Sequence, residues 1–90
     1  MKFKDWALEW LETYKKPSVS EESYISYMSC LKCHILPYLG NMQLKSIRAI
    51  HTQKVMNEMS GSSKKMINRI ANMLYGIFET AKSNNLVLEN

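Results

Sequence analysis

The feature that most constrains the fold is a row of apolar residues towards the C-terminal end of the sequence, spaced three or four positions apart. Such spacing places side chains on one face of an α-helix. The row consists of Met66, Ile67, Ile70, Met73, Leu74, Ile77, Phe78 and Ala81. It predicts a long amphipathic helix that begins after the break SGSS at residues 60–63 and ends near Ser83 or Asn84. Because such a helix must bury its apolar face, other elements of the chain are expected to cover it.

Two helices are predicted in the first forty residues. Apolar residues recur at helical spacing over residues 3–14, and Pro17 helps to end this first helix. Ser20 is placed to act as the N-cap of a second helix, with acidic residues in its first turn. The apolar positions of the second helix are Tyr24, Tyr27, Met28, Leu31 and Ile35.

Pro37 and Gly40 are expected to end the second helix, and Leu44 and Ile47 to be buried on either side of a short turn. Ser46 is expected to cap a third helix, whose apolar positions are Ile47, Ile50, Val55, Met56 and Met59. With the long C-terminal helix, this makes one all-α domain over residues 1–90. We expect four helices with short connections, in an orthogonal or bundle-like arrangement.

The composition agrees with a small helical domain. The chain has 90 residues with only 3 Gly and 2 Pro, fewer than an all-β chain of this length needs for its turns. No apolar run approaches the ~20 residues of a membrane span, and acidic residues interrupt the N-terminal segment, so neither an anchor nor a signal peptide is predicted. A cytoplasmic location is therefore expected. The net charge of +4 fits an anionic partner such as nucleic acid, although many inert domains are as basic.

Two readings compete for the side of the C-terminal helix that faces away from the apolar row. Lys and Arg contact phosphates or guanine edges, and Asn can make a bidentate contact with adenine, so this side suits DNA. Asn is also a poor helix former, so two of them on an exposed face need a reason. Gly76 on the same side would allow close approach of another backbone. The alternative is an ordinary solvated face. The residues concerned are Lys64, Lys65, Asn68, Arg69 and Asn72.

The run CLKCH at residues 30–34 has the spacing of a c-type haem attachment site. Cys30, Cys33 and His34 would also provide three of the four ligands of a zinc site, with His51 as the remaining candidate. In a cytoplasmic protein, two such cysteines are expected to be free thiols rather than a disulfide. Neither histidine has a Ser or Asp at a recognisable catalytic distance, and no glycine-rich phosphate loop is present, so no catalytic residue is predicted.

A series of short motifs runs along the chain in a defined order, and HILPYLG at residues 34–40 is the most specific of them. The others are Phe3-x-x-Trp6-Ala7-x-x-Trp10-Leu11, Ser20-x-x-Ser23-Tyr24, Leu44-x-x-Ile47, Ser62, Ile77-Phe78-x-x-Ala81 and Asn85-Leu86-Val87-x-x-Asn90. Together they resemble the core-binding domain of phage-type integrases, the tyrosine recombinases, from end to end.

The resemblance implies a SAM-like domain, a four- to five-helix orthogonal bundle that grips one side of a recombination site in double-stranded DNA. It implies that a separate domain, with a nucleophilic tyrosine, cleaves and rejoins strands without a metal or energy cofactor. The chain is then expected to be an excised part of a larger integrase that oligomerises on DNA, and not itself an enzyme. In similar domains the second and fourth helices face the major groove. The resemblance therefore adds Ser20, Ser23 and Lys32 to the DNA-contacting candidates, although the second helix is poor in basic residues. A protein–protein interaction module without DNA binding remains the main alternative.

Overall fold

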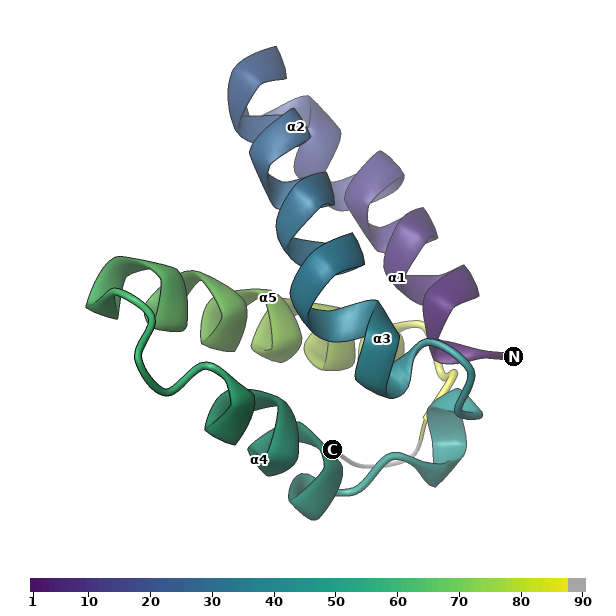
Figure 1. Cartoon of the computed structure of the whole chain (residues 1–90). Coiled ribbons are helices and arrows are strands. Elements are labelled where there is room, and N and C mark those ends of the chain that lie inside the picture. The colour runs from purple at the N-terminus through teal and green to yellow at the C-terminus, as the bar shows by residue number, and fades with distance from the viewer. Residues whose placement is uncertain (88–90) are drawn as a thin grey trace.

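Two helical rods and two further helices make up residues 1–87, the part of the chain described by a computed structural model (Figure 1). The first rod consists of α1 (Phe3–Trp10), η1 (Leu11–Lys15) and η2 (Lys16–Ser18). The second consists of α2 (Glu21–Cys30), η3 (Leu31–Ile35) and α3 (Leu36–Leu39). A turn, η4 (Leu44–Ser46), then leads to α4 (Ala49–Glu58) and α5 (Lys64–Ser83). Every regular element in residues 1–87 is helical, apart from an isolated β-bridge between Lys2 and Gln43. The prediction of an all-α domain of four to five helices is confirmed.

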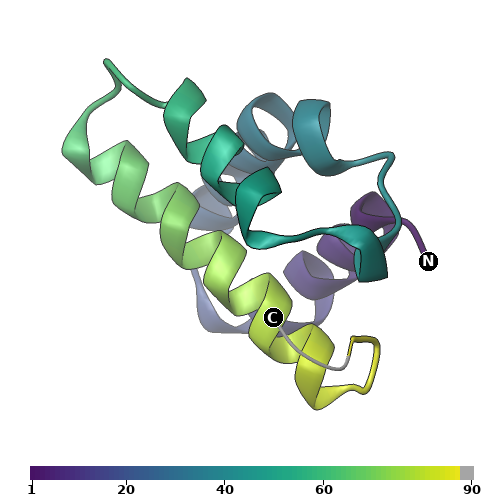
Figure 2. The ribbon, with the colours of Figure 1, turned by 90° about the horizontal axis from the view of Figure 1, so that it is seen from below.

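The long C-terminal helix α5 holds the other elements together. The two rods lie side by side, α5 crosses them at a steep angle, and α4 lies alongside α5 (Figures 1 and 2). The buried residues of α5 are Ile70, Met73, Leu74, Ile77 and Ala81. The other three members of the predicted apolar row are partly buried. No helix within residues 1–87 is both long and apolar enough to cross a membrane.

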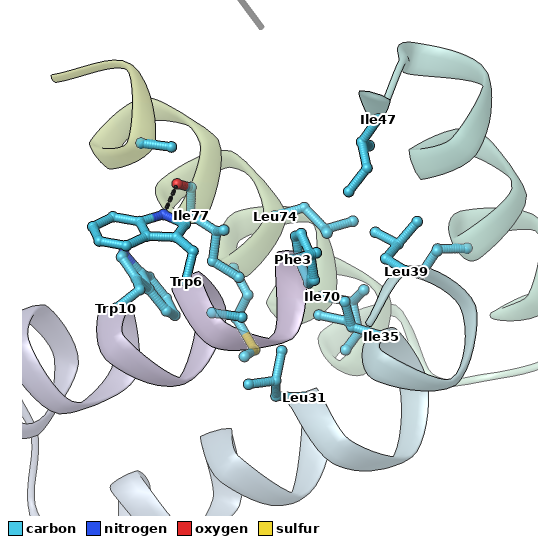
Figure 3. Packing of buried hydrophobic residues seen from close by; sticks show 14 of the residues in the cluster. Phe3, Trp6, Trp10, Leu31, Ile35, Leu39, Ile47, Ile70, Leu74 and Ile77 are labelled. Carbon is cyan, nitrogen blue, oxygen red and sulfur yellow. Dashed lines mark hydrogen bonds between the residues drawn. The ribbon is translucent and has the colours of Figure 1, made fainter. Parts of the chain in front are cut away.

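α1 packs on the middle of α5 through aromatic side chains (Figure 3). The indole N–H of Trp6 donates a buried hydrogen bond of 2.9 Å to the backbone carbonyl of Ile77. The rings of Phe3 and Phe78 lie 5.6 Å apart at their centroids. Trp10 lies over Gly76, where a Cβ atom would come within 2.9 Å of the indole ring. These contacts set both the spacing and the rotation of α5 against α1.

Of the two residues predicted to end the second helix, Pro37 lies inside the second rod and Gly40 ends it. A proline ring inside an α-helix clashes with the carbonyl four residues before it, which here belongs to Cys33. The turn η3 is a wider π-turn, in which the N–H of Leu36 donates to the carbonyl of Leu31 five residues back. We infer that this wider turn accommodates Pro37, so that the rod continues past it. The helix ends at Gly40. A Cβ atom at this position would lie only 2.7 Å from the Leu36 carbonyl oxygen.

The segment after α3 caps the start of α1. No side chain caps α1, and instead the N–H groups of Phe3 and Lys4 donate to the carbonyls of Met42 and Gly40 at 2.8 and 3.1 Å. Leu44 beyond this segment is buried, as predicted, and so is Ile47. The first turn of the chain's first helix is thus stabilised by residues forty positions away.

The start of the third helix was wrongly predicted. Ser46 lies in η4, and α4 begins only at Ala49, after Arg48. The Arg48 N–H donates to Nδ1 of His51 at 2.8 Å, which replaces the expected serine cap. Because the helix begins later than predicted, Ile50 lies in its first turn and is 61% exposed, although the apolar pattern places it in the core.

The end of α5 agrees with the prediction that the helix ends near Ser83 or Asn84. Asn85 adopts a left-handed conformation with φ of 60°, and the Leu86 N–H donates back to the Ala81 carbonyl at 2.9 Å. This geometry satisfies carbonyls that a helix end leaves open. Val87 of the last motif is buried in the core, whereas Leu88 and the final residue of that motif, Asn90, lie outside the described residues.

We predict that Gly76→Ala destabilises the fold, although Gly→Ala in an exposed helix typically stabilises by about 1 kcal/mol. The added methyl group would press on the buried Trp10 ring, and overpacking of this kind costs about 1–3 kcal/mol. Urea unfolding measures the change. In a Trp10→Leu background the penalty should largely disappear, and a stabilised Gly76→Ala single variant would contradict the assigned contact.

Candidate nucleic-acid interface

The start of α5 is a positively charged site on the surface. Ser63 caps the helix, since its hydroxyl oxygen accepts a hydrogen bond of 3.2 Å from the Met66 N–H. Lys64 and Lys65 are exposed in the first turn, which contains no acidic residue. The N-terminus of a helix already carries partial positive charge and favours anions. Two lysines there add to the positive charge of the helix end, although they interact unfavourably with it. The combined positive charge suits a phosphate group.

Lys64, Lys65, Asn68 and Asn72 together form an exposed surface, which we call the α5 polar face. None of these four side chains forms a hydrogen bond or ion pair with another residue in the part of the chain that the structure describes. Their donors and acceptors are therefore available to a partner. The apolar row is on the opposite side of the helix, so the packing of α5 leaves this face in solvent.

Arg69, the fifth residue predicted on this helix, lies at the edge of the α5 polar face and is partly buried. Its Nη1 atom donates to the Ser26 hydroxyl, and its guanidinium lies 4.7 Å from the centroid of the Tyr27 ring. Arg69 thus joins α5 to α2 at the place where the two helices meet. The sequence pattern counts Tyr27 among the apolar positions of the second helix and places Ser26 away from them, so it predicts no contact of either residue with Arg69. The two contacts span more than forty positions, so no local pattern could have indicated them.

Ser20 and Ser23 form hydrogen bonds with each other at the start of α2. Ser20 is the N-cap, and its oxygen accepts from the Ser23 N–H at 3.2 Å. The hydroxyl of Ser20 also donates to that of Ser23 at 3.1 Å. Glu21 and Glu22 follow in the first turn and balance the positive helix end. This end of α2 is therefore less favourable to a phosphate than the start of α5, and the two serines stay predictions as DNA contacts.

Lys32 is exposed in the π-turn η3, apart from the α5 polar face. Two residues before it, Cys30 faces α5, and its sulfur lies 3.7 Å from that of Met66. A step of two residues turns a helix to roughly its opposite side, so Lys32 points away from α5. The structure therefore does not bring Lys32 together with the α5 candidates.

The two cysteines of CLKCH have different environments, with Cys30 buried at 4% exposure and Cys33 exposed. A thioether bond to haem needs both sulfurs at the edge of one porphyrin, which the packing of Cys30 against Met66 does not offer. Among residues 1–87, no three His, Cys, Asp or Glu side chains gather into a group that could hold a metal ion.

Gly76 does not belong to the exposed surface, contrary to the sequence-based expectation. It faces the Trp10 ring, so the close approach it permits is that of α1 and not of a DNA backbone. Spacing alone places Gly76 on the same side of α5 as Arg69 and Asn72. Towards the C-terminal end of α5, however, Trp10 of α1 covers this side of the helix at Gly76.

Comparison with known proteins identifies one family. A model described as phage integrase, N-terminal SAM-like domain, matches residues 2–60, about two thirds of the chain. No curated protein and no solved structure matched. The matched segment includes both rods and α4, whereas α5 lies outside it.

We predict that Arg69 stabilises the fold and that its neighbour Asn72 does not. Arg69→Leu should lower the free energy of unfolding by about 1–2 kcal/mol, because it removes a hydrogen bond and a cation–π contact. Asn72→Ala, one turn further on the exposed side, should change it by less than about 0.5 kcal/mol or stabilise slightly. Chemical denaturation of both variants tests this difference. Equal free energies of unfolding would show that the contacts of Arg69 with α2 do not stabilise the fold.

Proposed function

The chain belongs to the family of phage integrase N-terminal SAM-like domains, and from this premise we propose that it binds duplex DNA as the core-binding domain of a tyrosine site-specific recombinase. In this role it grips one side of the recombination site while another domain of the parent protein cleaves and rejoins the strands. The parent acts as an oligomer on DNA, and this domain itself performs no catalysis.

The observation that carries the proposal is the α5 polar face. It combines two exposed lysines and two exposed asparagines, whose side chains have no partner among the described residues, with the positive end of a helix. Lysines next to helix N–H groups favour phosphates, and asparagines can read base edges. The net charge of +4 gives the domain a general attraction for DNA that these contacts then orient.

A second candidate function, a protein–protein interaction module, is favoured by a groove between α4 and α5. The groove has a volume of about 340 Å³ and is lined mainly by apolar atoms, with Tyr75 on its wall 69% exposed. Both Trp side chains, which an interaction module would present to its partner, are instead buried at 6% and 4% exposure. The DNA reading therefore has the stronger support.

We predict measurable binding of the domain to short duplex DNA at low salt, with an affinity that falls as salt rises. Each phosphate contact adds roughly −0.9 to the slope of log affinity against log salt concentration. Lys64→Gln/Lys65→Gln should weaken binding and reduce the slope by about one to two, which fluorescence anisotropy of a labelled duplex can measure at several salt concentrations.

The matched control is Lys2→Gln/Lys4→Gln, which removes the same charge from the other end of the molecule, where α1 begins (Figure 1). These exposed lysines lie far from the start of α5, so the control should keep most of the slope. Equal losses of affinity and salt slope in both double variants would contradict the assigned interface. No binding by the unmodified domain, even at low salt, would contradict the DNA-binding function.

A further inference from the structure

Three cationic side chains lie over tyrosine rings near the junction of the first rod, α2 and α5. The Lys15 ammonium is 4.8 Å from the centroid of the Tyr27 ring and 5.8 Å from that of Trp10. The Arg69 guanidinium is 4.7 Å from the same Tyr27 ring. Lys16, the next residue after Lys15, lies 5.8 Å from Tyr24 instead. The Tyr27 ring thus makes a cation–π contact with Lys15 at the end of the first rod and another with Arg69 of α5.

The two cations at Tyr27 have no anionic partner within residues 1–87. Lys15 and Arg69 form no ion pair there, and the ammonium of Lys15 makes no hydrogen bond either. Each is less than 5 Å from the same ring centroid, so the charges lie within about 10 Å of one another, roughly one Debye length at 0.1 M salt. An anion bound by both side chains would lower the repulsion between them.

The donors at this place suit the oxygens of a phosphate. Arg69 uses one N–H for Ser26, which leaves most of its five N–H groups free and fixes the plane of the guanidinium. Lys15 has three N–H groups, and the Tyr27 hydroxyl makes no hydrogen bond with another described residue. Because the ring already holds both cations in place, little side-chain freedom remains to be lost when a ligand binds.

We propose that Lys15, Tyr27 and Arg69 form a phosphate-binding seat that takes one backbone phosphodiester of duplex DNA. The inference rests on the proposed function and extends the interface to the end of the first rod, which the sequence-based candidates do not include. Lys65 precedes Arg69 by four residues and so lies beside it on α5, which makes the seat continuous with the α5 polar face.

The two adjacent lysines have different surroundings because successive residues of a helix point about 100° apart. Lys15 is the last residue of the π-turn η1, and the Lys16 N–H donates to the Leu11 carbonyl five residues back. Lys16 forms an ion pair of 3.4 Å with Glu12, to which the Tyr24 hydroxyl donates at 3.2 Å. Burial, and then this hydrogen bond to Glu12, raise the pKa of Tyr24. Lys16 therefore has an anionic partner, whereas Lys15 has none among residues 1–87.

The adjacent lysines provide a matched test in the full chain. Lys15→Gln and Lys16→Gln remove the same charge one residue apart, and binding to a labelled duplex is measured against salt concentration. Lys15→Gln should lower the affinity several-fold and reduce the magnitude of the salt slope by roughly 0.9, the value for one phosphate. Lys16→Gln should leave the slope nearly unchanged, and Lys15→Arg should retain it. Tyr27→Phe keeps the ring and should weaken binding without changing the slope.

Two outcomes would overturn the seat. Equal slopes for Lys15→Gln and Lys16→Gln, with the unmodified domain still bound to DNA, would reject it and leave the proposed function standing. Failure of the unmodified domain to bind the duplex would reject both. Far-ultraviolet circular dichroism and urea unfolding of each variant confirm that the comparison is made between folded proteins.

Discussion

The packing of α5 against α1 determines where every candidate residue of this domain lies. A single hydrogen bond from the Trp6 indole to the Ile77 carbonyl fixes the rotation of α5, and the absence of a side chain at Gly76 lets Trp10 approach it closely. With α5 held in this rotation, its apolar row faces the rods and α4. The α5 polar face is consequently left in solvent, and Arg69 at its edge points towards α2.

The parts of the fold that depend on local chemistry could be predicted from the sequence. The apolar row of α5, the cap at Ser20 and the stop at Asn84 and Asn85 each involve residues within a few positions of one another. The parts that were missed depend on distant residues or on an uncommon turn. The carbonyls that cap α1 come from the segment after α3, and the second rod passes Pro37 through a π-turn that propensity does not anticipate.

The same distinction applies to the candidate interface. Exposure of Lys64, Lys65, Asn68 and Asn72 follows from helical spacing and was predictable. The contacts of Arg69 with Ser26 and Tyr27, and the position of Lys15 over the same ring, depend on how three helices meet. Gly76 shows the limit of spacing most clearly, because it lies on the side that periodicity assigns to solvent and is covered by Trp10.

The longest helix of this small domain assembles the fold with its apolar side. We propose that its polar side, together with the cations at Tyr27, contacts the DNA backbone. The most direct test is an NMR titration of the ¹⁵N-labelled domain with duplex DNA at low salt. We predict that the largest amide shifts cluster at residues 64–72, with further shifts at Lys15 and around Tyr27. Shifts confined to α4 or to residues 3–10, or no shifts at all, would contradict it.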